Sequence, residues 1–508
     1  MESSGKLSCA VIGGGAAGHG ALLGLRDSSV DVSATLIDPP AGPRSPFEPE
    51  RYPQEAGPER GAYLRHLRAS LGRSLVPPKS HFGIRPETYD VTGWGPIWRG
   101  DTGGGLTRFW GASALPLPES GFRKWPFGMS ALRPHYEAIV SELPVAGRDD
   151  CLSALWGHGL ASRPPLSRPA IFDRLAAALE AALPGADGAY DLIPGSGRMA
   201  IETASGATTA CRYCGDCMAG CRFGAIYSAG DALAECRDLY DARVEAHVIA
   251  VDRAAGTLTI EQKGARRVLG PFDRIYLAAG CIGSTAILAR SGLAPRETEV
   301  QDNAVLTFLL AYLGGPVFAA ASTRYLALTN LVVACRPRRQ EDPMAALQLY
   351  PFFDYLWELH TPHLLAPALR GLSSLLRERL VIARLYLPAA MSQRYSLRVS
   401  GDGMPALSLK AAPADDDACA PLLRAVRAGL NRGGFFALPR PLLRHGTSSH
   451  YAGTLPLGGG YVDKQGRVAP GVYLCDSAAF PESPAFSPTL TIMAFAHHVA
   501  SRSAAAPP

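Results

Sequence analysis

Residues 211–221, CRYCGDCMAGC, place four cysteines in a C-x2-C-x2-C-x3-C pattern. Thiols at this spacing could hold an iron–sulfur cluster or a zinc ion, form disulfides, or simply line a cysteine-rich turn. The chain has 11 cysteines, and an odd number argues against a complete disulfide framework. We therefore expect free thiols or metal ligands.

The spacing itself favours a cluster over zinc. Two-residue gaps let successive thiolates surround one cluster, as in the ferredoxin run, which this sequence matches except for Arg222 in place of the usual proline. Structural zinc more often uses two C-x2-C pairs separated by a longer stretch. We predict a [4Fe–4S] cluster, with Cys236 as an alternative fourth ligand and with zinc or reduced structural cysteines as competing interpretations. The predicted ligands are Cys211, Cys214, Cys217 and Cys221.

A second motif lies at the start of the chain. The apolar run LSCAVI (7–12) predicts a strand, and Gly13, Gly15 and Gly18 follow it in G-x-G-x-x-G register before an apolar helix. A second strand pattern ends at Asp38. In this context the glycines would let the backbone approach a pyrophosphate at the helix N-terminus, and Asp38 would accept from a ribose hydroxyl. The alternative is a tight strand–helix turn without a ligand.

The order of the elements indicates two domains. A strand, glycine turn and helix recur at 274–292, and the chain ends with a further strand pattern and a helix at 488–502. Between them, long strands are predicted at 304–313, 327–335 and 392–400 and helices at 364–380 and 418–434; a further helix is predicted earlier, at 172–183. We predict an α/β fold in which a Rossmann-like domain is built from discontinuous segments and an α+β domain carries an antiparallel sheet. The predicted bounds are 1–145, 196–300 and 446–508 for the first domain, 301–445 for the second, and 146–195 for a cap or second-domain segment.

Composition excludes several classes of protein. Of the 508 residues 47% are apolar and 19% charged, which is typical of a globular chain, and the net charge of +5 without a dense basic block disfavours nucleic-acid binding. The first apolar run leads directly into the glycine motif, so we expect no signal peptide and a cytoplasmic protein. No run of about 18 apolar residues predicts a membrane span. Membrane or partner contact through the apolar stretch 345–390 is an alternative, but burial in the core is favoured.

Four stretches, in family order, resemble the glucose–methanol–choline (GMC) family of flavin oxidoreductases. They are the N-terminal glycine motif, YLAAGCIGSTAILARSGL, HYAGTLPLGG and VYLCDSAAFPESPAFSPTLTIMAFA. The resemblance implies FAD and the oxidation of an alcohol by hydride transfer, which needs a base near the substrate hydroxyl. Family members with covalent flavin use a histidine in the glycine-rich loop. The corresponding LTRFW segment has none, so we expect non-covalent FAD.

The resemblance also implies site residues. The histidine of the H-x-x-G-T motif falls on His450, the expected base, with a buried structural histidine as the alternative. The usual Asn or His before Pro-Thr-Leu-Thr is replaced by Ser487, which can hydrogen-bond a substrate oxygen but cannot act as a base. Asp476 matches an aspartate beside the flavin ribityl–pyrophosphate region, although it could equally cap a helix. Other residues assigned to the cofactor are Gly104, Val248, Pro488 and Thr489.

These features predict a dehydrogenase that oxidises a hydroxyl of a small alcohol or sugar-type substrate. A cluster near the flavin would pass electrons singly to an external acceptor. The alternatives are an oxygen-reducing oxidase and, because of Ser487, a non-catalytic flavin or electron-transfer protein. His497 and His498 are adjacent on the last predicted helix and face different directions, so we interpret them as surface residues and not as a metal site.

Overall fold

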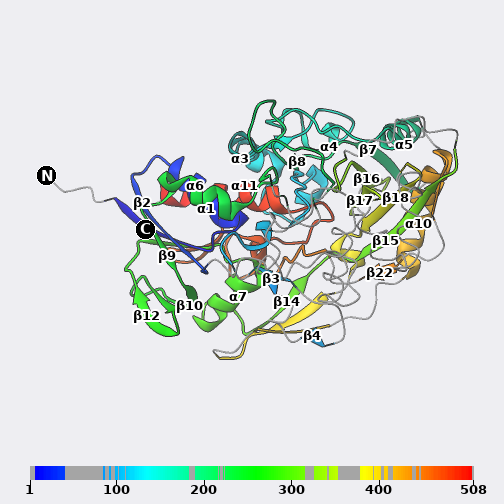
Figure 1. The fold of residues 1–508 in the computed structure, drawn as a ribbon. Helices are drawn as coiled ribbons and strands as arrows, with labels where there is room; N and C mark the ends of the chain where they lie inside the picture. Colours follow the sequence, from blue (N-terminus) through cyan, green and yellow to red (C-terminus); the bar gives the residue numbers. More distant parts are fainter. Residues whose placement is uncertain are drawn as a thin grey trace, which may run out of the picture.

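Figure 1 shows a computed structural model of the chain, in which a nucleotide-binding half lies beside a half built on a large antiparallel sheet. The structure describes residues 6–40, 84–85, 91–92, 98–100, 102–108, 110–181, 189–215, 217, 221, 223–314, 325–339, 343–352, 378–392, 394–401, 405–409, 416–437, 442–444 and 448–505.

The first half is built on a six-stranded sheet in the order β23-β24-β13-β1-β2-β9. Five strands run parallel, and β23 pairs antiparallel with β24 at one edge. The strands come from the start, middle and end of the chain, so the predicted Rossmann-like domain of discontinuous segments is confirmed. They are β1 (Leu7–Ile12), β2 (Val32–Asp38), β9 (Ala242–Glu245), β13 (Arg274–Leu277), β23 (Arg467–Ala469) and β24 (Val472–Leu474).

Close helix packing covers this sheet. Helix α1 crosses α11 with its glycines at the contact: a Cβ on Gly20 would lie 2.4 Å from the backbone oxygen of Met493, and one on Gly24 2.5 Å from that of His497. Because neither glycine has a side chain, the two backbones approach closely (Figure 1). Helix α3 packs against α11, and α7 packs against β10. The helices are α1 (Ala16–Arg26), α3 (Met129–Glu142), α7 (Cys281–Arg290) and α11 (Thr489–Ala504).

The second half is a seven-stranded antiparallel sheet in the order β21-β15-β18-β17-β16-β7, with β22 also pairing with β15. Its strands are β7 (Tyr190–Gly195), β15 (Val305–Tyr312), β16 (Leu331–Pro337), β17 (Ala345–Pro351), β18 (Leu380–Tyr386), β21 (Phe435–Ala437) and β22 (Leu442–Arg444). Helices α5 (Ala170–Ala181) and α10 (Asp416–Arg432) lie on its outer side (Figure 1). The expected antiparallel sheet is thus confirmed.

Smaller elements complete the described fold. A three-stranded sheet contains β10 (His247–Asp252), β11 (Thr257–Gln262) and β12 (Ala265–Leu269). A four-stranded sheet contains β14 (Glu297–Gln301), β19 (Arg394–Arg398), β20 (Ala406–Leu409) and β4 (Val91–Thr92). The two-stranded pairs are β3 (Ile84–Arg85) with β5 (Arg99–Gly100), and β6 (Val145–Ala146) with β8 (Met199–Ala200). Short helices are α4 (Ser153–Trp156), α6 (Ala229–Glu235), and the 3-10 turns Gly105–Arg108, Glu119–Phe122, Arg237–Leu239, Ala389–Met391 and Ser477–Ala479.

The long strands predicted within 301–400 match β15, β16 and β19, and the helices predicted near 172–183 and 418–434 match α5 and α10. A helix predicted over 364–380 falls almost entirely outside the described residues. Within the described parts of the chain, no helix has the length and apolar character needed to cross a membrane.

Candidate active site

The glycine motif forms a turn at the centre of the six-stranded sheet. Strand β1 lies between β2 and β13, so the crevice at its carboxyl end is the topological switch point where such folds bind ligands. Gly13 has φ +104°, and a Cβ on Gly18 would lie 1.8 Å from the Gly13 oxygen, so the turn itself requires both glycines. A Cβ on Gly15 would instead come no closer than 3.7 Å to a described protein atom, the Gly104 oxygen. The chain's own packing therefore does not explain Gly15, whereas a bound pyrophosphate would.

Helix α1 begins immediately after Gly15. Its first turn contains no acidic residue, and no side chain caps its N-terminus. The first N–H groups and the positive end of the helix dipole can therefore bind an anion. The predicted dinucleotide cradle fits the residues that are present.

Asp38 ends β2 beside this turn, and its side chain is 2% exposed. One carboxylate oxygen accepts from the Gly14 N–H at 2.8 Å, and the other lies 3.3 Å from a guanidinium nitrogen of Arg243. Burial raises the pKa of the Asp38 carboxyl, while these contacts and a hydrogen bond from the Gly104 N–H oppose the rise. A carboxylate has about four acceptor sites. Asp38 can therefore hold the turn and still accept from a ribose hydroxyl.

Asp476 links two parts of the cofactor half. It caps the turn Ser477–Ala479 by accepting from the Ala478 N–H, and its other oxygen accepts from the hydroxyl of Ser284 on α7. Burial raises the pKa of the Asp476 carboxyl to about 6 although these hydrogen bonds favour the charged form. The capping role that the sequence left open is therefore present in the fold.

The remaining residues assigned to the cofactor lie at element ends or irregularities. Gly104 has φ +93° in the loop facing Gly15, and Val248 is half-buried in β10 where its pairing with β11 shifts register. Pro488 precedes α11 and Thr489 begins it, at an N-terminus without a side-chain cap or an acidic residue in the first turn. These positions are compatible with FAD binding, and their roles stay predictions.

His450 is fixed through its backbone. Its N–H donates to a carboxylate oxygen of Asp302 at 3.1 Å and to the Ser448 hydroxyl at 3.0 Å. Its carbonyl accepts from the Ser483 hydroxyl at 2.7 Å. The imidazole stacks on Tyr386 of β18, with ring centroids 5.3 Å apart and an interplanar angle of 13°. The segment that carries His450 thus presents the ring to the antiparallel sheet.

Ser487 lies four residues beyond Ser483 and is 8% exposed. No hydrogen bond joins its hydroxyl to the His450 ring among the contacts of the described residues. The loop that carries Ser487 is nevertheless tied to His450 through Ser483. The structure therefore brings the two segments together but does not establish a direct pair.

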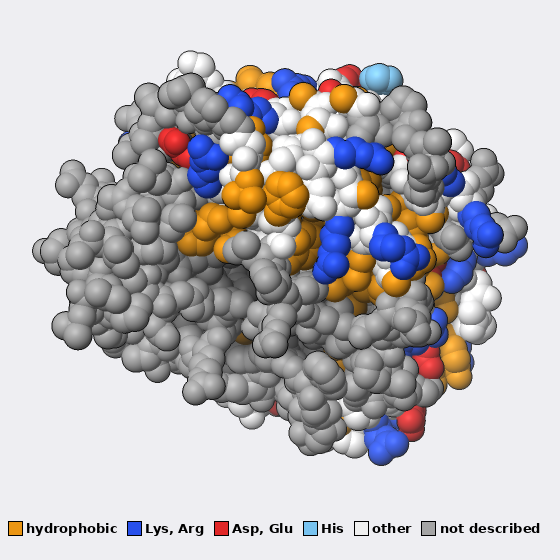
Figure 2. All heavy atoms as spheres, turned by 90° about the vertical axis from the view of Figure 1, so that its right-hand side faces the viewer, with side chains coloured by type: hydrophobic (Ala, Val, Ile, Leu, Met, Phe, Trp, Pro, Cys, Tyr) orange, Lys and Arg blue, Asp and Glu red, His pale blue; other side chains and the backbone are white. Residues whose placement is uncertain are grey.

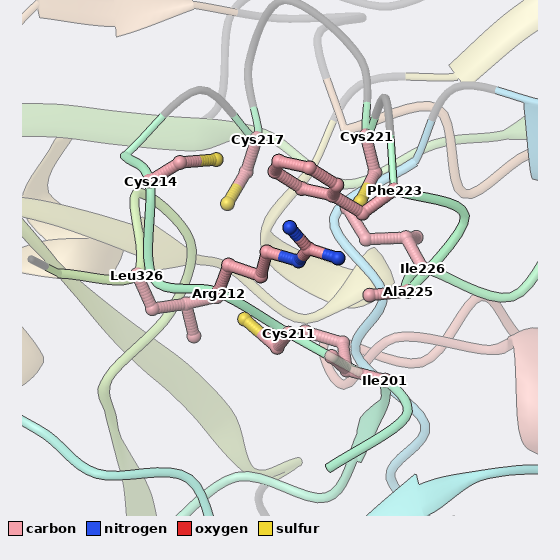
Figure 3. Close-up of a pocket in the computed structure, with 10 residues that line it drawn as sticks. All are labelled: Ile201, Cys211, Arg212, Cys214, Cys217, Cys221, Phe223, Ala225, Ile226 and Leu326. Carbon is pink, nitrogen blue, oxygen red and sulfur yellow. The ribbon is translucent and has the colours of Figure 1, made fainter. Parts of the chain in front are cut away.

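The four predicted ligand cysteines line one pocket. Cys211, Cys214, Cys217 and Cys221 are all reduced, and Figure 3 shows their sulfurs turned toward a common space. Cys236 is not among the lining residues. The space that remains is a cavity of about 20 Å³, enough for one water.

The positively charged side chain of Arg212 lies between these sulfurs. The Arg212 side chain projects into the pocket, and its guanidinium carbon lies 4.5 Å from the centroid of the Phe223 ring (Figure 3). Burial raises the pKa of both the Cys211 and Cys217 thiols. Within the described ranges, no three His, Cys, Asp or Glu side chains are arranged to hold a metal ion. The four thiols are suitable ligands for a cluster, but the pocket has no room for one while the Arg212 side chain occupies it.

The surface interpretation of His497 and His498 is wrong. Both are buried, at 5% and 6% exposure. Nδ1 of His135, on α3, lies 2.8 Å from Nδ1 of His497, and its Nε2 lies 3.0 Å from Nδ1 of His498. Nε2 of His497 lies 3.0 Å from a carboxylate oxygen of Asp27 at the end of α1. Adjacent residues can share one partner here because the His135 ring offers a nitrogen to each.

Comparison with known proteins agrees with this architecture. Residues 437–496 match the sequence model described as GMC oxidoreductase. No curated protein matches the chain. Similar solved structures include pyridoxine 4-oxidase from Mesorbium loti, at TM-score 0.63 and 16% identity over 98% of this chain and 99% of that one. A formate oxidase variant from Aspergillus oryzae RIB40 gives TM-score 0.62 and 14% identity over 98% of both chains.

A third similar structure is an FAD-dependent oxidoreductase from Chaetomium thermophilum, with TM-score 0.59 and 14% identity over 97% of this chain and 98% of that one. At these identities the likeness concerns the fold, and it extends over nearly the whole chain. Together with the match at 437–496, it shows that the chain has the two-domain fold of these flavoenzymes and that its C-terminal part is similar to the GMC oxidoreductase family.

Proposed function

We propose that the chain is an FAD-dependent dehydrogenase that oxidises a hydroxyl group of an alcohol or sugar-type substrate. The observation that carries this proposal is the placement of His450. It lies in the segment that matches the family, and its ring faces the antiparallel sheet of the other half. Bound FAD would accept the hydride that leaves the substrate carbon.

The chain's own residues bind the cofactor and handle the proton. The N-terminus of α1 beside Gly15 would hold the pyrophosphate and Asp38 the ribose, with Gly104, Val248, Asp476, Pro488 and Thr489 as further contacts. Binding is non-covalent in this proposal because LTRFW contains no histidine. A nitrogen of the His450 imidazole takes the hydroxyl proton, and Ser487 hydrogen-bonds the same oxygen or a neighbouring one. Clamping of the His450 backbone limits the directions in which the imidazole can point.

Anaerobic mixing with a panel of alcohols and sugars, followed by flavin absorbance, tests the proposal. His450→Ala should slow flavin reduction by about 10²–10⁴-fold, the usual contribution of a positioned base, with unchanged FAD content. Ser487→Ala should cost about 0.5–1.5 kcal/mol, as expected for one neutral hydrogen bond. If His450→Ala reduces its flavin at the wild-type rate, another residue acts as the base. If no substrate of the panel bleaches the flavin, a non-catalytic protein is favoured.

The alternative is an oxidase that reduces oxygen directly. It is favoured by two structural neighbours, a pyridoxine 4-oxidase and a formate oxidase. Hydrogen peroxide formed stoichiometrically with the oxidised product would establish it. Turnover that requires an added one-electron acceptor and yields little peroxide would instead support the dehydrogenase.

We further propose that the cysteine pocket holds a [4Fe–4S] cluster for electron transfer to an external acceptor. Support comes from the ligand spacing and from four reduced thiols around one pocket. Arg212 would have to leave the pocket, where it could stay nearby and balance the negative charge of thiolate ligands. Iron and sulfide analysis of protein prepared without oxygen tests the proposal, and Cys214→Ser should abolish both. Absence of iron from wild type would leave the cysteines a structural role.

A further inference from the structure

The large antiparallel sheet has two chemically different faces. On its outer face, apolar residues of β15, β16, β17 and β18 form a core with α5 and α10; examples are Phe308, Val333, Leu347 and Leu385. The residues that alternate with them belong to the opposite face. There, Tyr386, Val332 and Ala346 join the core of the nucleotide-binding half. This inner face therefore looks toward the cofactor domain.

The inner face carries a polar network in place of a continuous apolar surface. Gln348 and Arg384 are register partners on β17 and β18, so their side chains share a face. Tyr350 donates to the side-chain oxygen of Gln348 at 2.7 Å, and the Thr329 hydroxyl donates to the same oxygen at 3.1 Å. Tyr350 in turn hydrogen-bonds Arg384. Buried polar side chains are costly without partners, so such a network on one face needs a reason beyond packing.

Arg384 lies next to the proposed base. Its guanidinium carbon is 5.1 Å from the centroid of the Tyr386 ring, the ring on which His450 stacks at 5.3 Å. Both groups contact one aromatic ring, so they are separated by no more than the sum of these distances. A substrate long enough to span that separation could contact both groups.

The charge of Arg384 lacks a carboxylate partner among the described residues. It is half-buried, yet its contacts are phenol groups. Burial lowers the pKa of Arg384, but the phenol groups of Tyr386 and Tyr350 raise it by more, and the guanidinium stays charged as arginine does in proteins. Asp302 lies near Tyr386 but forms no ion pair with Arg384, and its described hydrogen bonds are to Asn303, Ser448 and His450. Arginines on nearby strands differ: Arg394 pairs with Glu299 and Arg398 with Glu297.

We propose that Arg384 binds an anionic group of the substrate, a carboxylate or a phosphate, and so selects hydroxy compounds that carry a negative charge. The fork of guanidinium donors matches either group, and a partly desolvated cation gains more from an anion than an exposed one. The proposal rests on the proposed function for the hydroxyl at His450. It adds a requirement on the rest of the substrate molecule.

Binding of redox-inert probes to the holoenzyme tests the anion site separately from catalysis. By isothermal titration calorimetry, benzoate and phenyl phosphate should bind to wild type, and benzamide should bind more weakly. Arg384→Met should weaken anion binding by about 10- to 100-fold and leave benzamide unchanged. Arg384→Lys should retain part of the anion affinity, and the ratio of the two anion affinities separates phosphate from carboxylate selectivity. Arg398→Met, at an exposed ion pair, is the control for loss of one positive charge.

Kinetics with a matched pair of alcohols then links the site to turnover. Anaerobic flavin reduction by 4-(hydroxymethyl)benzoate should exceed that by 4-(hydroxymethyl)benzamide in wild type and in Arg398→Met, and Arg384→Met should lose the preference. Equal anion affinity in wild type and Arg384→Met, or no anion binding by wild type, would overturn the proposal even if the neutral alcohol reduces the flavin. Arg384-dependent anion binding without flavin reduction by any alcohol would instead refute the proposed oxidation. Flavin content and melting temperature of each variant exclude misfolding.

Discussion

Replacement of His135 by phenylalanine should destabilise the protein in a pH-dependent way. His498, His135, His497 and Asp27 form a row of hydrogen bonds. When all three imidazole rings are neutral, each hydrogen bond in this row has one donor and one acceptor. His498 donates from Nδ1 to Nε2 of His135, and His135 donates from Nδ1 to Nδ1 of His497. The remaining N–H of His497 reaches Asp27. A proton added to Nε2 of His135 would face the N–H of His498 and break this row.

The size of the effect follows from the titration of His135. Burial, with the nearby charges of His498, His497 and Arg502, lowers its pKa to about 3, against 6.5 for the free side chain. A group with a depressed pKa contributes stability above its unfolded pKa and loses it as pH falls toward the folded value. At pH 5, protonation of His135 in the unfolded protein lowers the free energy of unfolding by about 2 kcal/mol. At pH 7.5 that term is absent, and phenylalanine leaves two ring nitrogens without partners, at a cost of about 1–3 kcal/mol.

Wild type should therefore be about 2 kcal/mol more stable than His135→Phe at pH 7.5 and nearly equal to it at pH 5. Urea unfolding followed by circular dichroism at both pH values measures the difference. His158→Phe, at a side chain that is 78% exposed, serves as the control and should shift neither value. If the stability difference between wild type and His135→Phe is the same at pH 5 and pH 7.5, His135 titrates alike in the folded and unfolded protein. That result would refute the row of hydrogen bonds between neutral histidines.

Three further predictions concern the cofactor half. Gly15→Val should abolish FAD binding. Its circular dichroism should stay unchanged, because no described protein atom lies closer than 3.7 Å to the added Cβ. If the variant retains flavin, the pyrophosphate does not bind at this turn. Gly20→Leu should lower stability by about 1–3 kcal/mol in thermal unfolding, since its Cβ would meet the Met493 oxygen at 2.4 Å. Asp476 has a folded pKa of about 6 against 3.8, so its favourable contribution is present below pH 3.8 and lost as pH rises through 6. Asp476→Asn should therefore gain about 2 kcal/mol relative to wild type between pH 4.5 and 7.5 in urea unfolding of the apoprotein, and a pH-independent difference would contradict the burial argument.

Local sequence patterns predicted the parts of the fold that depend on local rules. The turn at Gly13 and Gly18 requires glycine for its backbone geometry, and such a turn between an apolar strand and a helix has few alternatives. The antiparallel sheet was also predictable, because β15 and β16 are long and rich in β-branched and leucine residues. The roles of Asp38 and His450 came from motif position, which says nothing about their neighbours.

Contacts between distant segments could not be predicted in the same way. His497 and His498 point in different directions from their helix, and it took α3, more than 350 residues earlier, to place His135 between them. The convergence of the four cysteines was implied by their spacing, but the intrusion of Arg212 was not. A charged residue within the otherwise apolar run VIARLYL was a signal for Arg384, although one strand does not reveal which face its neighbours cover.

The orientation of the His450 ring depends on both halves of the molecule. Its backbone is fixed by Asp302 and Ser448 on one side and by Ser483 on the other, whereas its ring rests on Tyr386 of the antiparallel sheet. Figure 2 shows the side of the molecule that carries α5 and α10, where arginine and lysine side chains lie among apolar ones. Arg384 belongs to the opposite, inner face of the sheet, so these surface cations are not part of its site. In the proposed function the motif supplies the base, and β18 selects the substrate that this base can reach, because Arg384 and Tyr386 lie on the same face of that strand.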